Sequence, residues 1–177
     1  MSYLVIFDCV DADGLRNVVL NNSNYNICNH TMQSKDFYII SNNQTLDDIP
    51  NDTQQLYFYK YHNEVIKIIH ISNNSFNQIK HIGIGKGTFR EINEFVIDGL
   101  ESLESVKIGE YCFRISDKER NDGVCRITNC PNLRQLDIGW NSFADFQSFE
   151  LSYLNSIQSI NFGGYCFKYA DLSLKGE

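Results

Sequence analysis

Six cysteines are the residues of this 177-residue chain whose type best suits metal binding or redox chemistry. Their spacing favours neither use, because the sequence contains no Cys-x-x-Cys pair and no paired Cys/His pattern of a zinc site. Cysteine also fills apolar positions as a small hydrophobic side chain. We therefore predict mostly buried free thiols, with disulfides as the main alternative, and we expect neither a metal site nor a cofactor.

The aspartates near the N-terminus offer the strongest enzymatic pattern. The segment Y-L-V-I-F-D-C-V-D-A-D-G-L resembles the first motif of haloacid-dehalogenase-type phosphatases, in which an apolar strand runs into D-x-D-G. That resemblance implies an Asp nucleophile and an Asp acid/base beside Mg²⁺. Here Asp8 ends the apolar run, and Cys9 and Val10 displace Asp11 and Asp13 from it. A small Mg-dependent phosphatase using Asp8 or Asp13 is therefore an alternative, and we expect a non-catalytic protein.

A repeated unit organises most of the chain and would position any functional residues. Four sets of like residues advance along the chain by one common series of steps, in which the middle step is longer than the other two. A common spacing in several columns is typical of a solenoid. The longer middle step contains the polar run 116–123, which we expect to loop into solvent. The columns are Gly85, Gly109, Gly139 and Gly163; Phe89, Phe113, Phe143 and Phe167; Ile82, Val106, Leu136 and Ile160; and Ile79, Leu103, Leu133 and Ile157.

Each unit is predicted to contain two short β-strands. Apolar and polar residues alternate in V-K-I-G and L-D-I-G, and again in the segments 95–97, 125–127 and 149–151. We interpret the glycine that ends the V-K-I-G type of strand as a corner at positive φ, where a Cβ would clash. One unit cannot bury its apolar side alone, so stacked units would form a continuous core.

The unit resembles a leucine-rich repeat. The pattern L-x-x-Φ-x-Φ occurs in N-C-P-N-L-R-Q-L-D-I at 129–138, and I-G-E-Y-C-F at 108–113 is similar to the I-G-x-x-A-F signature of the BspA-like subclass. The match covers about residues 65–174, and more weakly 7–25. The resemblance implies a mainly β, right-handed solenoid with a parallel sheet on its concave side, two short strands per ~24-residue repeat, little helix and a binding role.

The repeat divides the chain into three regions. Residues 1–30 are interpreted as a diverged N-terminal repeat, and residues 31–64 as degenerate repeats with longer loops and strands near 37–40 and 56–59. Residues 65–177 are interpreted as the regular array, which ends in an incomplete repeat with a strand near 172–174. An uncapped end leaves apolar surface and strand edges exposed, so we expect possible self-association through this C-terminal end.

Composition and charge narrow the classes of partner. The formal net charge is −7, with few basic clusters, which is unfavourable for nucleic acid or an anionic membrane surface. No stretch approaches the ~18 apolar residues of a membrane helix. The N-terminal residues lack the basic start of a secretory signal, so we predict a cytoplasmic protein.

Surface residues of the predicted solenoid are the remaining candidates for function. The middle residues of the V-K-I-G type strands should point outward on successive repeats, and aromatic residues follow the corner glycines. Aromatic residues and arginine are typical anchors of protein–protein contacts. Stacked rungs lie ~5 Å apart, so the same rings could instead only pack on their neighbours. The candidate binding surface comprises Lys107, Tyr111, Arg134, Asp137, Trp140, Asn161 and Tyr165.

The sequence therefore predicts a non-catalytic protein–protein interaction module of the leucine-rich-repeat type, with a protein partner that the residues do not identify. Two alternatives stay open. One is a fragment of a longer structural repeat array that self-associates. The other is the small phosphatase described above.

Overall fold

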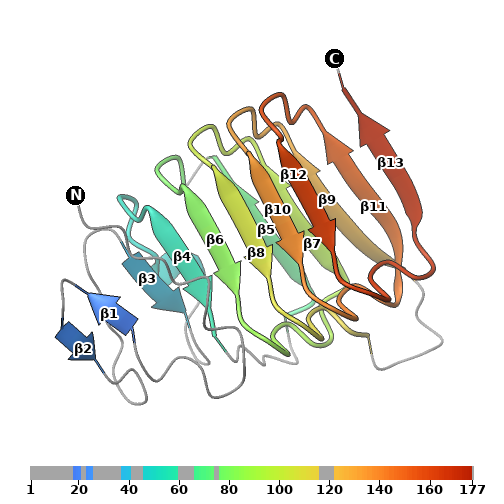
Figure 1. Cartoon of the computed structure of the whole chain (residues 1–177), viewed down its shortest axis with the longest axis horizontal. Coiled ribbons are helices and arrows are strands. Elements are labelled where there is room, and N and C mark those ends of the chain that lie inside the picture. Colours follow the sequence, from blue (N-terminus) through green and yellow to red (C-terminus); the bar gives the residue numbers. More distant parts are fainter. Residues whose placement is uncertain are drawn as a thin grey trace.

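A computed structural model of the chain describes residues 18–20, 23–25, 37–40, 46–59, 66–73, 76–115 and 122–176. These residues form a parallel β-solenoid of about four turns with almost no helix (Figure 1). One short 3₁₀ helix, η4, spans Leu46–Asp48. The strands are β1 (Val18–Leu20), β2 (Ser23–Tyr25), β3 (Phe37–Ile40), β4 (Gln55–Phe58), β5 (Ile68–Ser72), β6 (His81–Ile84), β7 (Glu94–Asp98), β8 (Ser105–Ile108), β9 (Gly123–Thr128), β10 (Gln135–Ile138), β11 (Phe146–Ser152), β12 (Ser159–Phe162) and β13 (Asp171–Lys175).

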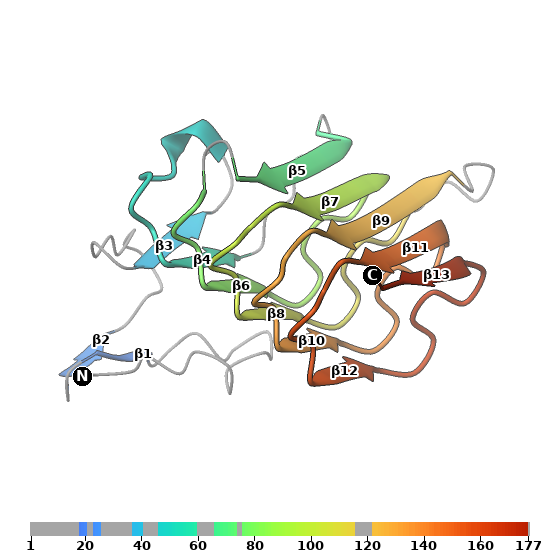
Figure 2. The ribbon, with the colours of Figure 1, turned by 90° about the horizontal axis from the view of Figure 1, so that it is seen from above.

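Two parallel sheets form the walls of the solenoid. The six-strand sheet has the order β12-β10-β8-β6-β4-β3, and the five-strand sheet has the order β13-β11-β9-β7-β5. Figure 2 shows the two sheets as separate walls joined by turns. We call one strand of the six-strand sheet together with the following strand of the five-strand sheet a rung. The rungs are β4–β5, β6–β7, β8–β9, β10–β11 and β12–β13, and the last four carry the predicted repeat columns. The strands β1 and β2 pair antiparallel in a sheet of their own.

The predicted mainly β solenoid with two short strands per repeat is confirmed. Residues of one sequence column become direct neighbours in the sheet, since Leu136 pairs with Val106 on one side and with Ile160 on the other. The strands expected near 37–40, 56–59 and 172–174 are β3, β4 and β13. Most of residues 1–30 and the inserted residues 116–121 lie outside the described residues, so the division into three regions stays a prediction.

A ladder of phenylalanine rings fills the core between the sheets. Successive ring centroids in the predicted column are 5.2, 4.3 and 4.9 Å apart, and the last two pairs are stacked with interplanar angles of 9°. All four side chains are buried, which confirms that the column points inward. Such ring contacts add to the free energy of apolar burial. The column consists of Phe89, Phe113, Phe143 and Phe167.

The corner glycines have a different role from the one predicted. The predicted positive φ at Gly85, Gly109, Gly139 and Gly163 is wrong, because the glycines with positive φ in the described residues are Gly87 and Gly99. The column instead requires close contact between backbones. A Cβ on Gly139 would lie 2.6 Å from the backbone nitrogen of Glu110, and a Cβ on Gly163 would lie 2.4 Å from that of Trp140. Glycine is therefore needed because neighbouring rungs touch there.

Left-handed backbone falls on residues that follow these glycines, and most of these residues are aromatic. A non-glycine residue at positive φ costs about 1–2 kcal/mol, so each turn needs compensating contacts. Hydrogen bonds between rungs supply part of this compensation, since the amide of Phe113 donates to the Thr88 carbonyl and the amide of Phe143 donates to the Cys112 carbonyl. The aromatic residues concerned, with φ between 49° and 63°, are Phe89, Tyr111, Phe113, Phe143, Tyr165 and Phe167.

Small side chains form a buried column beside the phenylalanine ladder. The Ser142 hydroxyl accepts a hydrogen bond from the Cys112 amide at 3.0 Å and donates one to the Gly109 carbonyl at 2.7 Å. The Cys112 thiol donates to the Gly85 carbonyl at 3.1 Å, and burial raises the pKa of this thiol to about 12. Thr88 occupies the same column, yet its buried hydroxyl has no hydrogen-bond partner among the described residues.

The prediction of free thiols is confirmed for the four cysteines that the structure describes. Cys112, Cys125 and Cys130 are buried and Cys166 is half-buried, and all four are free. Burial raises the pKa of each thiol above its ordinary value. The thiols are therefore protonated at neutral pH, which makes them poor nucleophiles. Cys9 and Cys28 lie outside the described residues.

Ser142→Ala and Thr88→Val should differ in their effect on stability. Ser142→Ala removes a hydroxyl that joins two backbone groups, so we expect it to lower the free energy of unfolding by about 1–3 kcal/mol. Thr88→Val removes a hydroxyl without a described partner, and the free energy of unfolding should change little. Urea denaturation of both variants measures the difference. Equal losses would show that the column does not depend on these hydrogen bonds.

Candidate interaction surface

Polar side chains form a row across the outer face of the six-strand sheet. Lys107 on β8, Asp137 on β10 and Asn161 on β12 are direct neighbours in the strand register. The Asn161 amide donates to the Asp137 carboxylate at 2.7 Å, and Gln135 donates to the other oxygen of that carboxylate. The structure therefore brings together the three polar residues predicted to point outward.

A shallow depression lies over the ends of β8, β10 and β12. It has a volume of about 270 Å³ and is bounded by residues 107–110, 137–139 and 161–163. Gly109, Gly139 and Gly163, the glycines at which neighbouring rungs touch, are among the residues that line it. A partner could reach backbone atoms here as well as the polar row.

An aromatic row runs along the turns beside this depression. The rings of Tyr111 and Trp140 meet edge to face with centroids 4.9 Å apart, and those of Trp140 and Tyr165 do so at 5.7 Å. The indole of Trp140 also lies over Gly164, where a Cβ would come within 3.2 Å of its ring nitrogen. The rings thus pack on neighbouring rungs, as the short distance between rungs predicts. Trp140 and Tyr165 nevertheless remain 39% and 63% exposed.

A cation extends the aromatic row toward β6. The Lys86 ammonium lies 5.4 Å from the centroid of the Tyr111 ring and 2.8 Å from the Glu110 carboxylate. A cation over an aromatic face is an attractive contact, although it is small where solvent reaches both groups. Lys86 therefore helps to fix the orientation of Tyr111, a contact that the repeat pattern did not predict.

Arg134 is the one predicted residue that the structure separates from the aromatic row. Arg134 is exposed and precedes β10, whereas Trp140 follows the same strand. The two residues therefore lie toward opposite ends of the strand. The backbone of Arg134 joins three rungs, because its amide donates to the Glu104 carbonyl and its carbonyl accepts from the amides of Gln158 and Ser159.

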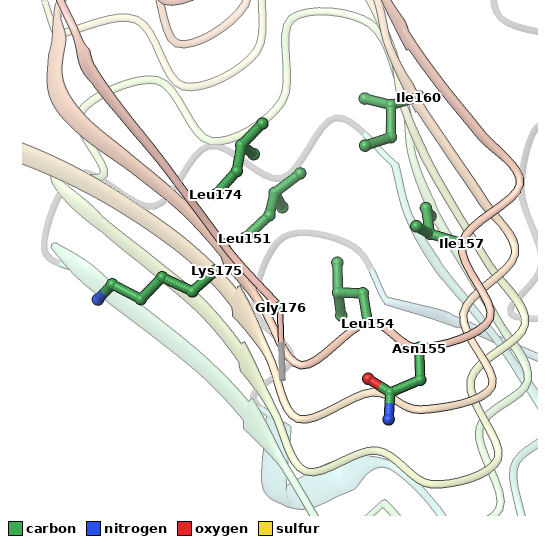
Figure 3. Close-up of a pocket in the computed structure, with 8 residues that line it drawn as sticks. All are labelled: Leu151, Leu154, Asn155, Ile157, Ile160, Leu174, Lys175 and Gly176. Carbon is green, nitrogen blue, oxygen red and sulfur yellow. The ribbon is translucent and has the colours of Figure 1, made fainter.

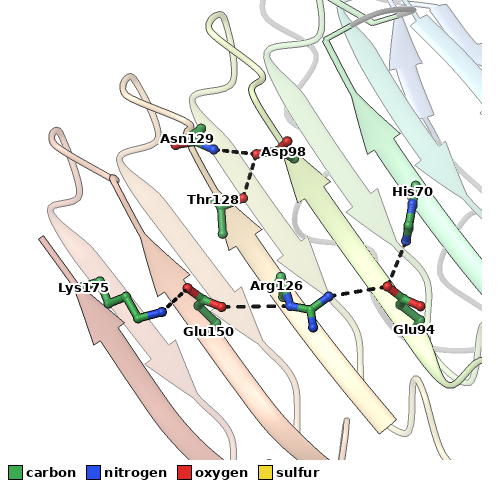
Figure 4. A network of polar contacts seen from close by, with 8 residues as sticks. All are labelled: His70, Glu94, Asp98, Arg126, Thr128, Asn129, Glu150 and Lys175. Carbon is green, nitrogen blue, oxygen red and sulfur yellow. Dashed lines mark hydrogen bonds and ion pairs between the residues drawn. The ribbon is translucent and has the colours of Figure 1, made fainter.

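The five-strand sheet carries a ladder of charged side chains that sequence reasoning missed (Figure 4). Arg126 lies between two carboxylates, at 3.5 Å from Glu94 and 3.9 Å from Glu150. His70 contacts Glu94 at 3.1 Å, and Lys175 contacts Glu150 at 2.8 Å. The hydrogen bond from Lys175 is the main cause that lowers the pKa of the Glu150 carboxyl. We call these five residues the charge ladder; its signal in the sequence was the opposite signs of Arg126 and Glu150 at equivalent positions of consecutive repeats.

The described residues offer neither a metal site nor a membrane-spanning helix. Within the described ranges, His, Cys, Asp and Glu side chains form no group of three or more that could hold a metal ion. No helix of the described residues is long and apolar enough to cross a membrane. Asp8 and Asp13, the residues of the predicted phosphatase alternative, lie outside the described residues.

Known proteins give no match to this chain. No family model matches the sequence, and neither the curated proteins nor the solved structures contain a match. The solenoid fold is therefore established by the strand pairing of the chain itself. The resemblance to BspA-like leucine-rich repeats rests on the residues of the repeat.

Proposed function

We propose that the chain is a non-catalytic protein-interaction module that binds its partner through the outer face of the six-strand sheet and the adjoining aromatic row. One observation carries this proposal. Trp140 and Tyr165 are exposed large aromatic residues, and they stand beside a polar row that spans three rungs. Exposed aromatic residues next to aligned polar groups are a typical composition of protein-binding surfaces.

The architecture supports this proposal because a solenoid presents an extended surface that its own packing leaves available. Each rung contacts only its neighbours, so residues on the outer faces are not needed for the core. Lys107 and Asp137 illustrate the point, since they alternate with buried apolar residues along their strands. We include in the proposal that the module is of the leucine-rich-repeat type, as the I-G-E-Y-C-F and L-x-x-Φ-x-Φ patterns suggest.

Charge and cysteine chemistry suggest the kind of partner and the compartment. The net charge of −7 disfavours nucleic acid and anionic membranes, so we propose a protein partner. The four described cysteines are free thiols, which fits a reducing compartment such as the cytoplasm. The polar row contains both a cation and a carboxylate. It therefore suits a partner segment with amide or mixed charged groups better than one of a single charge sign.

Photo-crosslinking from single positions tests this proposal. A photoreactive phenylalanine analogue at Tyr165 should capture the partner in an extract of the source cells, because Tyr165 is the most exposed ring of the aromatic row. The matched control is the same analogue at Ile68, an exposed apolar residue on β5 of the other sheet. The proposal predicts a protein adduct that is enriched at Tyr165 and absent at Ile68.

A binding measurement then tests whether the captured protein uses the aromatic row. Trp140→Ala should weaken the affinity by about 2 kcal/mol, or roughly thirtyfold in Kd, as truncation of an interface anchor does. Ile68→Ala should leave Kd unchanged, since Ile68 lies on the other sheet. Equal capture at both positions, or a Kd that Trp140→Ala does not alter, would exclude this surface as the binding site.

A further inference from the structure

The last rung has the residues of an internal rung, but no strand that the structure describes covers them. Its inward positions on β12 and β13 hold large apolar side chains that are exposed by 38–71%. The equivalent residues one rung earlier are at most 4% exposed, because the last rung covers them. The exposed residues are Ile160, Phe162, Leu172 and Leu174, and their buried equivalents are Leu136, Ile138, Phe149 and Leu151.

An apolar cavity opens at this end of the solenoid (Figure 3). Its volume is about 470 Å³, and most of its lining is aliphatic. In Figure 3, Leu151 and Leu174 project from the five-strand sheet, while Ile157 and Ile160 lie across the cavity from them. An exposed apolar surface of this kind, continuous with the core, favours a covering partner.

Among the described strands, those that end the two sheets here pair on one side only. β12 is the outermost strand of the six-strand sheet, and β13 is the outermost strand of the five-strand sheet. The free amide and carbonyl groups of an edge strand are a template for pairing with a further strand. The end of the solenoid thus offers backbone hydrogen bonds and apolar contacts together.

The charge pattern of β13 indicates which strand fits this edge. The strand reads D-L-S-L-K, with Asp171 and Lys175 at its two ends and Ser173 at its centre. Antiparallel pairing with a second copy, centred on Ser173, would place Asp171 of each copy opposite Lys175 of the other. The same register would place Leu172 opposite Leu174. Parallel pairing in register would instead oppose like charges, which is unfavourable.

The charge ladder of the five-strand sheet also favours pairing of β13 with a second copy of the chain. The signs alternate from Glu94 through Arg126 and Glu150 to Lys175, so the ladder reaches the free edge with a cation (Figure 4). An anion from the covering strand would continue the alternation. Asp171 forms no ion pair with any residue that the structure describes, and the register above brings Asp171 of the second copy to Lys175.

We propose that two copies of this chain form a two-fold symmetric dimer in which β13 pairs antiparallel with β13 of the second copy around Ser173. A two-fold interface is self-complementary and closed, so it covers the apolar C-terminal end of each copy at once. This proposal is independent of the protein-binding surface on the six-strand sheet, because it rests on β13 of the five-strand sheet.

Opposite charge changes at the two ends of β13 test the dimer. The mass of the 177-residue chain in solution is measured by sedimentation over a range of concentrations, and a dimer has twice the 20.5 kDa of one chain. Asp171→Lys should place lysines opposite each other at both ends of the paired strands. Lys175→Glu should likewise oppose acidic residues. Each variant alone should dimerise roughly tenfold more weakly.

Mixing the two variants should restore the dimer, because each Lys of one variant then faces an acidic residue of the other. Glu101→Lys is the control for net charge, since Glu101 is exposed in a turn away from β13, and it should dimerise like the unchanged chain. Circular dichroism of each variant verifies that the β-structure is intact. Recovery upon mixing would be specific to the antiparallel register, since neither a folding defect nor a general charge effect produces it.

Other outcomes would overturn the proposal. A monomer at every concentration would exclude the dimer, and hydrogen exchange would then show whether β12 and β13 are protected by another segment of the same chain. Assemblies that grow beyond two copies would indicate head-to-tail stacking. A dimer unaffected by Asp171→Lys and by Lys175→Glu would place the interface elsewhere on the molecule.

Discussion

Phe143→Ala is expected to lower the free energy of unfolding by about 3–5 kcal/mol, the range for truncation of a buried aromatic side chain. The Phe143 ring is fully buried and lies between Phe113 at 4.3 Å and Phe167 at 4.9 Å. It also meets Phe146 edge to face at 4.9 Å. Alanine would leave a cavity in the middle of the ladder. The neighbouring rings are held by their own rungs, so they cannot collapse fully into the space.

The position of Phe143 between two rungs adds to this effect. In a solenoid each rung is stabilised by its contacts with the rungs on either side, so a defect in a shared contact weakens two interfaces. Urea denaturation should show a lower midpoint for Phe143→Ala and for Phe113→Ala, which loses the same stacked pair. Lys107→Ala is the control on the outer face, where the free energy of unfolding should change by less than about 0.5 kcal/mol. Similar losses of unfolding free energy in all three variants would contradict the assignment of the phenylalanines to the core and of Lys107 to the outer face.

The register of the solenoid could be predicted from the sequence because spacing along the chain determines it. When one rung stacks on the next, residues separated by one repeat become neighbours. Leu136 therefore pairs with Val106 of the preceding repeat and with Ile160 of the following one. The longer middle step does not disturb this register, because the inserted residues lie between β8 and β9. The phenylalanine ladder followed from the same arithmetic.

Backbone conformation at the corners could not be predicted in the same way. A glycine at Gly139 indicates only that a side chain is not tolerated, and either a positive φ or a close neighbouring backbone produces that requirement. The sequence does not distinguish these causes, because the second one depends on Glu110 in another rung. The positive φ of Phe113 and Phe143 could not be predicted from the sequence either, since large aromatic residues rarely adopt it.

On the candidate surface, too, the sequence predicts some contacts and not others. Lys107, Asp137 and Asn161 share one column, so their contact followed from the repeat. Trp140 is displaced by one position from the column of Tyr111 and Tyr165, and its contact with both rings depends on a side-chain orientation over a neighbouring glycine. The charge ladder was missed because most of its contacts run diagonally between columns. Diagonal contacts depend on side-chain length and strand stagger, which spacing alone does not give.

Gly139→Ala provides the sharpest test of why the repeat needs glycine. The added Cβ would lie 2.6 Å from the Glu110 nitrogen and 2.6 Å from the Gly109 carbonyl carbon. Both are backbone atoms of the preceding rung, so no side-chain rotation relieves the contact, and the two rungs must separate. Small-to-large changes in packed interiors typically cost about 1–3 kcal/mol, and we expect about 3 kcal/mol here because only backbone can move.

Two comparison variants separate close approach from a positive-φ requirement. Gly99 has a φ of 70°, and the nearest contact of an added Cβ, the Asn73 Cβ, is at 3.5 Å. Gly99→Ala should therefore lower the free energy of unfolding only by the left-handed strain of about 1–2 kcal/mol. Gly139→Asn is the more decisive one, because asparagine tolerates positive φ better than alanine but has a larger side chain. If rung contact is the cause, urea denaturation will show Gly139→Asn to be at least as unstable as Gly139→Ala. An asparagine variant clearly more stable than the alanine variant would instead restore the positive-φ explanation and remove backbone contact as the reason for the glycine column.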